Sequence, residues 1–175
     1  MQDSLEIRAS TPGDVAELES LYPVAFPDED LLPLVRSLLA DSDVALSFVA
    51  TIDDQVAGHS MFTNCGVTDS DIKGSLLGPL AVVPAWQKQG VGTALVRTGL
   101  HELAAAGISF VCVLGDPAYY GRLGFDVEAS VEPPYRLPPA WHDAWRSQYL
   151  GETRQDVSGK LLVPLQWREP ALWAD

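Results

Sequence analysis

Residues 78–95 read GPLAVVPAWQKQGVGTAL, an apolar strand that runs into a glycine-containing turn and then into a helix. The N–H groups in the first turn of a helix have no partner within the helix, and the aligned peptide dipoles place partial positive charge there. Phosphate groups bind readily at such helix starts. The stretch therefore predicts a site for a phosphate-bearing ligand at Lys88–Thr93.

This stretch lies inside a predicted strand-helix-strand unit. Ser75–Val83 is almost continuously apolar, which is typical of a strand in the centre of a sheet. Gly90–Ala106 repeats apolar residues at helical spacing, and Ser109–Leu114 is a second apolar run. Because a helix connects the two strands, they are expected to be parallel.

The chain before this unit predicts a strand, two helices and a hairpin, in that order. Alternating apolar and charged residues indicate the first strand, and a capping pattern with a first-turn proline, Thr11-Pro12-Gly13-Asp14, begins the first helix. A two-residue turn, Asp53-Asp54, joins the hairpin. The expected bounds are Leu5–Ala9 for the strand, Pro12–Tyr22 and Asp28–Leu39 for the helices, and Ala45–Ile52 and Gln55–Thr63 for the hairpin strands.

The chain after the unit is less regular. Ala118–Leu123 is expected to form a short helix. Leu161–Trp167 is expected to be a final strand, at the edge of the sheet because Pro164 cannot donate to a ladder. Residues 128–150 are rich in proline and aromatic residues, which predicts an irregular segment with a short helix over Pro139–Leu150.

Length and composition indicate one domain. The chain has 175 residues, of which 47% are apolar, enough to bury one core and too few for two ordinary domains. It has no apolar run long enough to span a membrane and no signal-peptide pattern, so we expect a soluble, cytoplasmic protein. Cys65 and Cys112 lack metal-ligand spacing, which favours free thiols over a zinc site.

The net charge of −13 at pH 7 argues against partners that need a basic surface. Nucleic acid and anionic membranes are therefore not expected to bind. Residues 1–75 hold 14 acidic residues against Arg8, Arg36 and Lys73. Such a surface would attract a cationic ligand, although solubility alone also explains it.

Three kinds of phosphate loop occur at glycine-containing strand-helix junctions. The dinucleotide-binding pattern needs a third glycine where this chain has Leu95, and an acid about twenty residues further on, which is missing. A nucleotide-hydrolase loop needs Gly-Lys-Ser/Thr, which is also missing. The third kind matches, because Gln87-Lys88-Gln89-Gly90-Val91-Gly92 resembles the Arg/Gln-x-x-Gly-x-Gly/Ala signature of the GNAT superfamily of acetyl-CoA-dependent N-acetyltransferases.

A second motif supports this resemblance. Tyr119-Tyr120-Gly121-Arg122-Leu123-Gly124-Phe125 resembles the aromatic-Tyr-x-x-x-Gly-Phe motif of the same family, and Leu80-Ala81-Val82-Val83-Pro84 resembles its fourth strand. The order of elements also agrees over residues 5–127. The resemblance implies an α/β fold with a central mixed β-sheet of six to seven strands and about four helices, in which the fourth and fifth strands are parallel and splayed. It also implies a single N-acetyltransferase domain over residues 1–175, of which residues 128–175 are a less typical C-terminal part.

The resemblance further implies which residues bind acetyl-CoA. The backbone of Leu80, Ala81 and Val82 would pair with the pantetheine arm as an added strand does. The loop at the helix start would hold the pyrophosphate. In this loop the resemblance assigns Lys88, Gln89, Gly90, Val91, Gly92 and Thr93. No metal ion is implied.

Tyr120 matches the general acid of the family, which gives a proton to the leaving thiolate. The alternative for Tyr120 is a packed aromatic side chain with one hydrogen bond. The N–H of Val82 would hold the oxyanion. Asp116 is expected to cap the short helix rather than to contact acetyl-CoA.

The sequence assigns no base to take the amine proton. Many relatives carry a glutamate on the fourth strand, but Leu76–Leu80 offers no carboxylate. His59 is the nearest titratable residue, although a lone histidine on a strand is more often structural. A further cluster, which would either cover the acceptor pocket or belong to the core, consists of Trp141, His142, Trp145 and Tyr149.

The predicted function is transfer of the acetyl group of acetyl-CoA to a primary amine of a small molecule or peptide by direct attack. Two alternatives stay open. One is a non-catalytic acyl-CoA-binding or sensing module in which Tyr120 only packs. The other is an interaction domain that uses the Pro- and Trp-rich tail. A homodimer through the last strands is compatible with the pattern, and the acidic first half favours a cationic acceptor.

Overall fold

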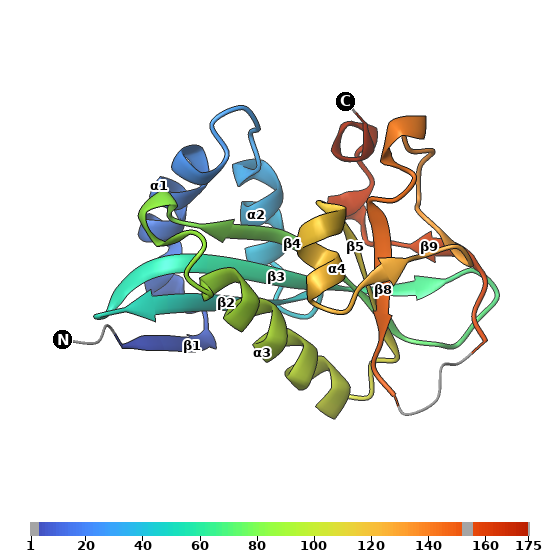
Figure 1. The fold of residues 1–175 in the computed structure, drawn as a ribbon, viewed down its shortest axis with the longest axis horizontal. Helices are drawn as coiled ribbons and strands as arrows, with labels where there is room; N and C mark the ends of the chain where they lie inside the picture. The colour runs from blue at the N-terminus through green and yellow to red at the C-terminus, as the bar shows by residue number, and fades with distance from the viewer. Residues whose placement is uncertain (1–3, 152–155, 175) are drawn as a thin grey trace. The chain divides into compact units, whose positions relative to one another are not determined.

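The computed structural model describes residues 4–151 and 156–174. The fold is mixed α/β with a mixed sheet, and the described residues form four α-helices and nine strands (Figure 1). Two compact units make up the chain. The first contains the residues up to Phe62 together with Gly78–His101, and the second contains Thr63–Leu77 and the residues from Glu102 onward. A single domain over the whole chain stays a prediction.

The first unit is built mainly from seven elements. They are β1 (Leu5–Ala9), α1 (Val15–Ala25), α2 (Leu32–Leu39), β2 (Ala45–Ile52), β3 (Gln55–Val67), β4 (Gly74–Val82) and α3 (Val91–Ala105). Of these, β3, β4 and α3 continue into the second unit. The strand order is β1-β2-β3-β4, and β1 pairs antiparallel with β2, from Leu5 opposite Ile52 to Ala9 opposite Phe48.

Asp53 and Asp54 form the predicted hairpin turn. Their φ angles are 51° and 66°, as a type I′ turn requires, and aspartate tolerates this left-handed conformation better than most residues. A two-residue connection of this type makes β2 and β3 antiparallel neighbours.

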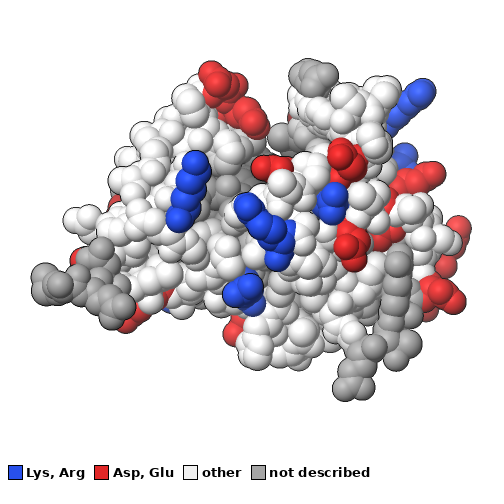
Figure 2. All heavy atoms as spheres, viewed as in Figure 1, with Lys and Arg blue, Asp and Glu red and all other residues white. Residues whose placement is uncertain are grey.

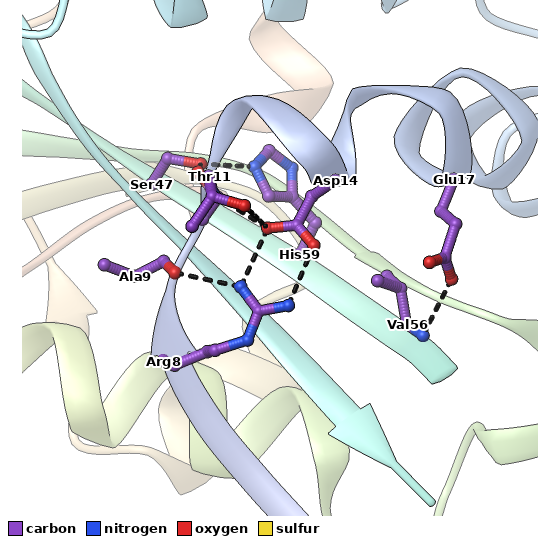
Figure 3. A network of polar contacts seen from close by, with 9 residues as sticks. Arg8, Ala9, Thr11, Asp14, Glu17, Ser47, Val56 and His59 are labelled. Carbon is purple, nitrogen blue, oxygen red and sulfur yellow. Dashed lines mark hydrogen bonds and ion pairs between the residues drawn. The ribbon is translucent and has the colours of Figure 1, made fainter. Parts of the chain in front are cut away.

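The capping box that the sequence predicts is present, but it caps the 3-10 turn Pro12–Asp14 that leads into α1 (Figure 3). The N–H of Thr11 donates to Asp14 Oδ2 over 2.7 Å. The Arg8 guanidinium donates two hydrogen bonds of 2.8 Å, one to each carboxylate oxygen of Asp14. These Arg8 contacts, with the help of the Thr11 N–H, lower the pKa of Asp14 to about 2, although its burial acts the other way. The ion pair therefore connects β1 to the first helix.

Helices cover both faces of the first unit's sheet. Tyr22 of α1 places its hydroxyl 2.6 Å from His59 Nδ1 on β3. Gly58, the preceding residue of β3, lies beside Val91 and Leu95 of α3. Because successive residues of a strand point to opposite faces, α1 and α3 cover opposite faces (Figure 1).

The second unit contains the remaining strands and one helix. Its elements are β5 (Phe110–Leu114), α4 (Pro117–Arg122), β6 (Asp126–Val127), β7 (Val131–Glu132), β8 (Trp145–Tyr149) and β9 (Gly159–Leu162). β4 and β5 are parallel, as predicted, and pair from Gly74 opposite Phe110 to Leu77 opposite Val113. β8 pairs antiparallel with both β5 and β6, and β9 pairs with β3 and β7. The splaying of β4 and β5 stays a prediction.

The predicted helix over Pro139–Leu150 is wrong. Only Pro139–Trp141 forms a single 3-10 turn, and Trp145–Tyr149 is strand β8. All five residues of β8 pair with β5, so the backbone partners of this segment come from the sheet rather than from its own turns. The aromatic side chains of the segment consequently do not share a helical face.

Other predicted boundaries also differ from the structure. α1 continues through Pro23 to Ala25, past the expected end at Tyr22, and β3 continues to Val67, past the expected end at Thr63. The last strand ends at Leu162, and Leu165–Trp167 is a 3-10 turn after Pro164, which has no N–H to continue a ladder. α2 begins at Leu32 and not at Asp28, which leaves Pro33 in the first turn, where its missing N–H costs no hydrogen bond.

Three tryptophans form the centre of the second unit's core. The ring centroids of Trp145 and Trp173, and those of Trp167 and Trp173, are each 5.8 Å apart. Each indole N–H has an acceptor: Trp145 donates to Val131 O, Trp167 to Thr63 Oγ1 and Trp173 to Trp167 O. The tail tryptophans are therefore core side chains with satisfied hydrogen bonds.

Both cysteines are free thiols, as predicted. Cys112 on β5 is buried, and Cys65 on β3 is half-buried. Burial raises the pKa of each thiol above its usual range. Both thiols are therefore protonated at neutral pH, which makes them poor nucleophiles.

No helix among residues 4–151 and 156–174 is long and apolar enough to cross a membrane. On the face drawn in Figure 2, the Lys and Arg side chains are few and scattered over uncharged surface, and several carboxylates lie together. That nucleic acid and membranes do not bind stays a prediction.

Candidate active site

The loop before α3 has the geometry of an anion site. Lys88 and Gly90, the residues on either side of Gln89, both have positive φ angles, 63° and 88°. The N–H of Ala94 donates to Gly90 O over 3.0 Å, which makes this the first hydrogen bond of the helix. The N–H groups of residues 91–93 therefore have no partner within the helix, as is typical of anion sites at helix starts.

The loop is exposed, and side-chain hydrogen bonds fix it to the backbone that precedes it. Residues 87–90 are exposed. The side chain of Gln87 donates to Val82 O, and that of Gln89 donates to Ala85 O, each over 3.1 Å. A Cβ atom on Gly90 would meet no heavy atom within 4 Å, so the need for glycine there comes from its φ of 88°.

The end of β4 lies in the same unit as this loop. Ala81 is buried, whereas Leu80 and Val82 are half-buried on the opposite face of the strand. The N–H of Val83 donates to Ala57 O over 2.8 Å, which ties the end of β4 to β3. All nine predicted acetyl-CoA-binding residues therefore belong to the first unit: Leu80, Ala81, Val82, Lys88, Gln89, Gly90, Val91, Gly92 and Thr93.

Tyr120 lies in α4, which belongs to the second unit. Its ring packs edge-on against Tyr119 and Phe125, with centroid distances of 5.0 and 5.8 Å. A Cβ atom on Gly115 would lie only 2.4 Å from Tyr120 Cε2, so this glycine makes room for the ring. Burial, with smaller effects of Tyr119 and Asp116, raises the pKa of Tyr120 above its usual range. The phenol is therefore protonated at neutral pH.

Asp116 caps α4, as the sequence predicts. Its Oδ1 accepts a hydrogen bond of 3.0 Å from the N–H of Ala118, the second residue of the helix. Pro117 occupies the first helical position, where a missing N–H is harmless. Asp116 and Pro117 thus begin the helix that carries Tyr120.

His59 is a structural residue. It is fully buried, and both ring nitrogens are occupied: Tyr22 Oη lies 2.6 Å from Nδ1. Figure 3 shows the second contact, in which Ser47 Oγ lies 2.7 Å from Nε2. Burial lowers the pKa of His59 to about 4, although the charge of Asp14 acts in the opposite direction. The imidazole is neutral at pH 7 and has no free nitrogen to take a proton from a substrate.

His59 predicts how stability depends on pH. Its pKa lies near 4 in the folded protein and near 6.5 when exposed, so only the unfolded chain gains a proton between these values. The free energy of unfolding should therefore fall as pH drops from 6.5 to 4, by about 3 kcal/mol from this residue. Urea unfolding of the wild type and His59→Gln at intervals of pH measures this. An equally steep fall in His59→Gln would assign it to other groups.

Glu128 is a buried carboxylate that sequence reasoning missed. It is 6% exposed, and its Oε2 accepts from the N–H groups of Ser130 and Val131 at 2.7 and 2.9 Å. Its Oε1 accepts from Ser147 Oγ and Tyr149 Oη at 2.7 and 2.9 Å. Burial alone would raise the pKa of Glu128, but these hydrogen bonds outweigh it and lower the pKa. Glu128 is therefore ionised at neutral pH, and protein hydrogen-bond donors satisfy both carboxylate oxygens.

The predicted aromatic cluster is not one surface. Trp145 is buried in the core and Tyr149 is bonded to Glu128, whereas His142 is exposed. Trp141 is half-buried in the 3-10 turn. Trp145 and Tyr149 lie four residues apart on β8 and therefore on the same face of the strand, where Trp145 is buried and Tyr149 is half-buried. That the cluster covers an acceptor pocket stays a prediction.

Comparison with known proteins identifies the family. The Acetyltransferase (GNAT) family model matches residues 14–125, which include both predicted motifs. The Uncharacterized N-acetyltransferase YjhQ of Escherichia coli strain K12 is 34% identical over 156 residues, 85% of this chain and 86% of that relative. The Uncharacterized N-acetyltransferase YhbS of the same strain is 36% identical over 124 residues, 70% of this chain and 74% of YhbS. This chain belongs to the GNAT acetyltransferase family, and it is an acyltransferase.

Two solved structures share the fold over nearly the whole chain. The GNAT family N-acetyltransferase YhbS from Escherichia coli, crystallised in complex with CoA, has a TM-score of 0.87 and 28% identity, covering 97% of this chain and 94% of YhbS. A GNAT family acetyltransferase from Brucella melitensis, crystallised with acetyl-CoA, has a TM-score of 0.76 and 28% identity, covering 95% and 99%. The predicted fold class is thus confirmed, but the described residues form nine strands and not the six to seven expected, because short strands such as β6 and β7 join the sheet.

Proposed function

We propose that this enzyme transfers the acetyl group of acetyl-CoA to a primary amine by direct attack. The observation that carries the proposal is the exposed loop before α3, whose three unpaired N–H groups follow two residues with positive φ. This loop has the donor set that a pyrophosphate needs. The two structural relatives bound to CoA and acetyl-CoA support the same donor substrate.

The proposed binding mode uses two parts of the first unit. The pyrophosphate binds the backbone of Lys88–Thr93, where the partial charge of the helix start favours an anion. The pantetheine arm pairs with the backbone of Leu80–Val82 as an additional strand. Lys88 is exposed and contributes positive charge beside the phosphates.

The proposed reaction forms an amide and breaks the thioester. The amine nitrogen attacks the carbonyl carbon of the acetyl group, and the N–H of Val82 stabilises the negative charge on the carbonyl oxygen. The C–S bond then breaks, and the sulfur leaves with its electron pair. The hydroxyl of Tyr120, which burial keeps protonated, gives the leaving sulfur a proton as negative charge develops on it. The amine loses its own proton to a base that we assign to no residue, because His59 is fully occupied.

The acidic first half favours a cationic amine, either a small molecule or a peptide. Asp28, Glu29 and Asp30 are all exposed between α1 and α2. Opposite charge increases the rate at which a cationic acceptor meets the enzyme, and salt weakens this effect. We therefore expect cationic amines to react fastest, with a kcat/KM that falls as ionic strength rises.

Acetyl-CoA should raise the melting temperature of the protein. At 100 times its Kd, a ligand adds about 2.7 kcal/mol to the free energy of unfolding, which raises the Tm of a chain of this size by about 5–10 °C. Adenosine, which lacks the pyrophosphate, is the control and should cause little change. Release of free CoA in the presence of a panel of amines then tests catalysis. Absence of both the Tm shift and CoA release would refute the proposal.

A further inference from the structure

Gly58 lies where β3 meets the first turn of α3, within the first unit. A Cβ atom on Gly58 would lie 2.9 Å from Ala81 O, 3.0 Å from Leu95 Cδ1 and 3.1 Å from Val91 Cγ1. The first of these neighbours is a backbone atom, which cannot rotate away. The φ angle of Gly58 is not positive, so its backbone conformation does not require glycine. The close approach of its neighbours explains why this position has no side chain.

A second glycine fits the same helix to the same strand. A Cβ atom on Gly99 of α3 would lie 2.1 Å from two ring atoms of Phe62, a fully buried residue of β3. Side chains of α3 therefore pack against β3 at Gly58, and the Phe62 side chain of β3 packs against α3 at Gly99. These two contacts, one made by side chains of the helix and one by a side chain of the strand, fix the position of α3 along β3.

The end of β4 is held at the same point. Ala57, the residue before Gly58, accepts the hydrogen bond from the N–H of Val83, and Ala81 O lies against Gly58 itself. One short piece of β3 thus contacts both the end of β4 and the first turn of α3. It sets the span between the β4 backbone and the loop before α3.

We propose that Gly58 is a positioning residue for acetyl-CoA: its missing side chain sets the span between the β4 backbone that binds the pantetheine arm and the loop that binds the pyrophosphate. The inference rests on the proposed function, because this span matters only when one ligand occupies both places. Two linked groups bind tightly together only if both reach their places at once. A wrong span therefore weakens the binding of whole acetyl-CoA much more than the binding of either half.

The experiment compares the wild type with Gly58→Ala on acetyl-CoA and on its two halves, S-acetylpantetheine and adenosine 3′-phosphate 5′-diphosphate. Calorimetry gives the Kd of acetyl-CoA, and ligand-observed NMR gives those of the halves. In Gly58→Ala the Kd of acetyl-CoA should rise about tenfold, while each half changes less than about twofold. The KM for acetyl-CoA should rise with it, and kcat at saturation should be retained.

The chain offers a matched control on the same strand. A Cβ atom on Gly66 would meet no heavy atom within 4 Å, so Gly66→Ala makes the same change without a clash and should leave all three Kd values unchanged. Circular dichroism and Tm verify that each variant folds. Should Gly58→Ala fold poorly, Gly58→Ala with Val91→Ala removes one of the clashing side chains and is compared with Val91→Ala alone.

The outcomes separate the two proposals. If the wild type binds acetyl-CoA and Gly58→Ala binds it equally well, or loses the halves as strongly as the whole, the positioning role of Gly58 is wrong and the proposed function stands. If the wild type binds neither acetyl-CoA nor its halves, the proposed function is wrong, and the role of Gly58 is refuted with it.

Discussion

Replacement of Tyr120 by phenylalanine is expected to lower kcat by about 100-fold, the usual contribution of a positioned general acid. The variant keeps the ring that packs on Tyr119 and Phe125 and loses only the hydroxyl. Burial raises the pKa of Tyr120, so the wild-type phenol is protonated throughout the neutral range and carries the proton that the proposed step needs. The KM for acetyl-CoA should change less than about twofold, because the hydroxyl acts in the transition state.

Two variants around Tyr120 complete this prediction. Tyr119→Phe removes the neighbouring hydroxyl from the same helix and should keep near-normal turnover. Gly115→Ala keeps the Tyr120 hydroxyl but places a Cβ atom 2.4 Å from the ring, so the ring must move and kcat should fall. CoA release under saturating acetyl-CoA measures all three. Full turnover by Tyr120→Phe, or an equal loss in Tyr119→Phe, would remove Tyr120 as the acid.

The parts of the fold that the sequence predicts well are those decided by neighbouring residues. The bounds of α3 agree with the prediction to within one residue, since the glycine before it and the glycine after it both have positive φ. The Asp53-Asp54 turn and the capping box at Asp14 depend in the same way on a few adjacent side chains. The acetyltransferase motifs are also local, so the family was predictable from them.

The parts that sequence reasoning missed depend on contacts between distant residues. Trp145–Tyr149 shows an aromatic spacing that suits a helix, and only its pairing with Phe110–Leu114 makes it a strand. Glu128 was missed for the same reason, because two of its hydrogen-bond donors, Ser147 and Tyr149, lie on this strand. Gly58 belongs to no motif at all, and its role depends on the approach of α3.

Replacement of Glu128 by leucine is expected to lower the free energy of unfolding by about 3 kcal/mol. Leucine fills a similar volume but accepts no hydrogen bond, so the N–H groups of Ser130 and Val131 lose their acceptor. A buried donor without a partner costs about 1–3 kcal/mol, and the hydroxyls of Ser147 and Tyr149 lose the same acceptor. Glu128→Gln should cost less, about 1 kcal/mol, because its amide oxygen still serves the backbone pair.

Urea unfolding at pH 7 measures these differences, with Glu132→Leu as the matched control. Glu132 lies in the same short stretch but is exposed, so its replacement should change stability by less than about 0.5 kcal/mol. The pKa of Glu128 is lowered in the fold, so its contribution is present above its ordinary pKa and lost as pH falls through the folded value. The difference between wild type and Glu128→Leu should therefore shrink in acid. A difference that stays constant down to pH 2 would mean that lost packing, and not the ionised carboxylate, destabilises the variant.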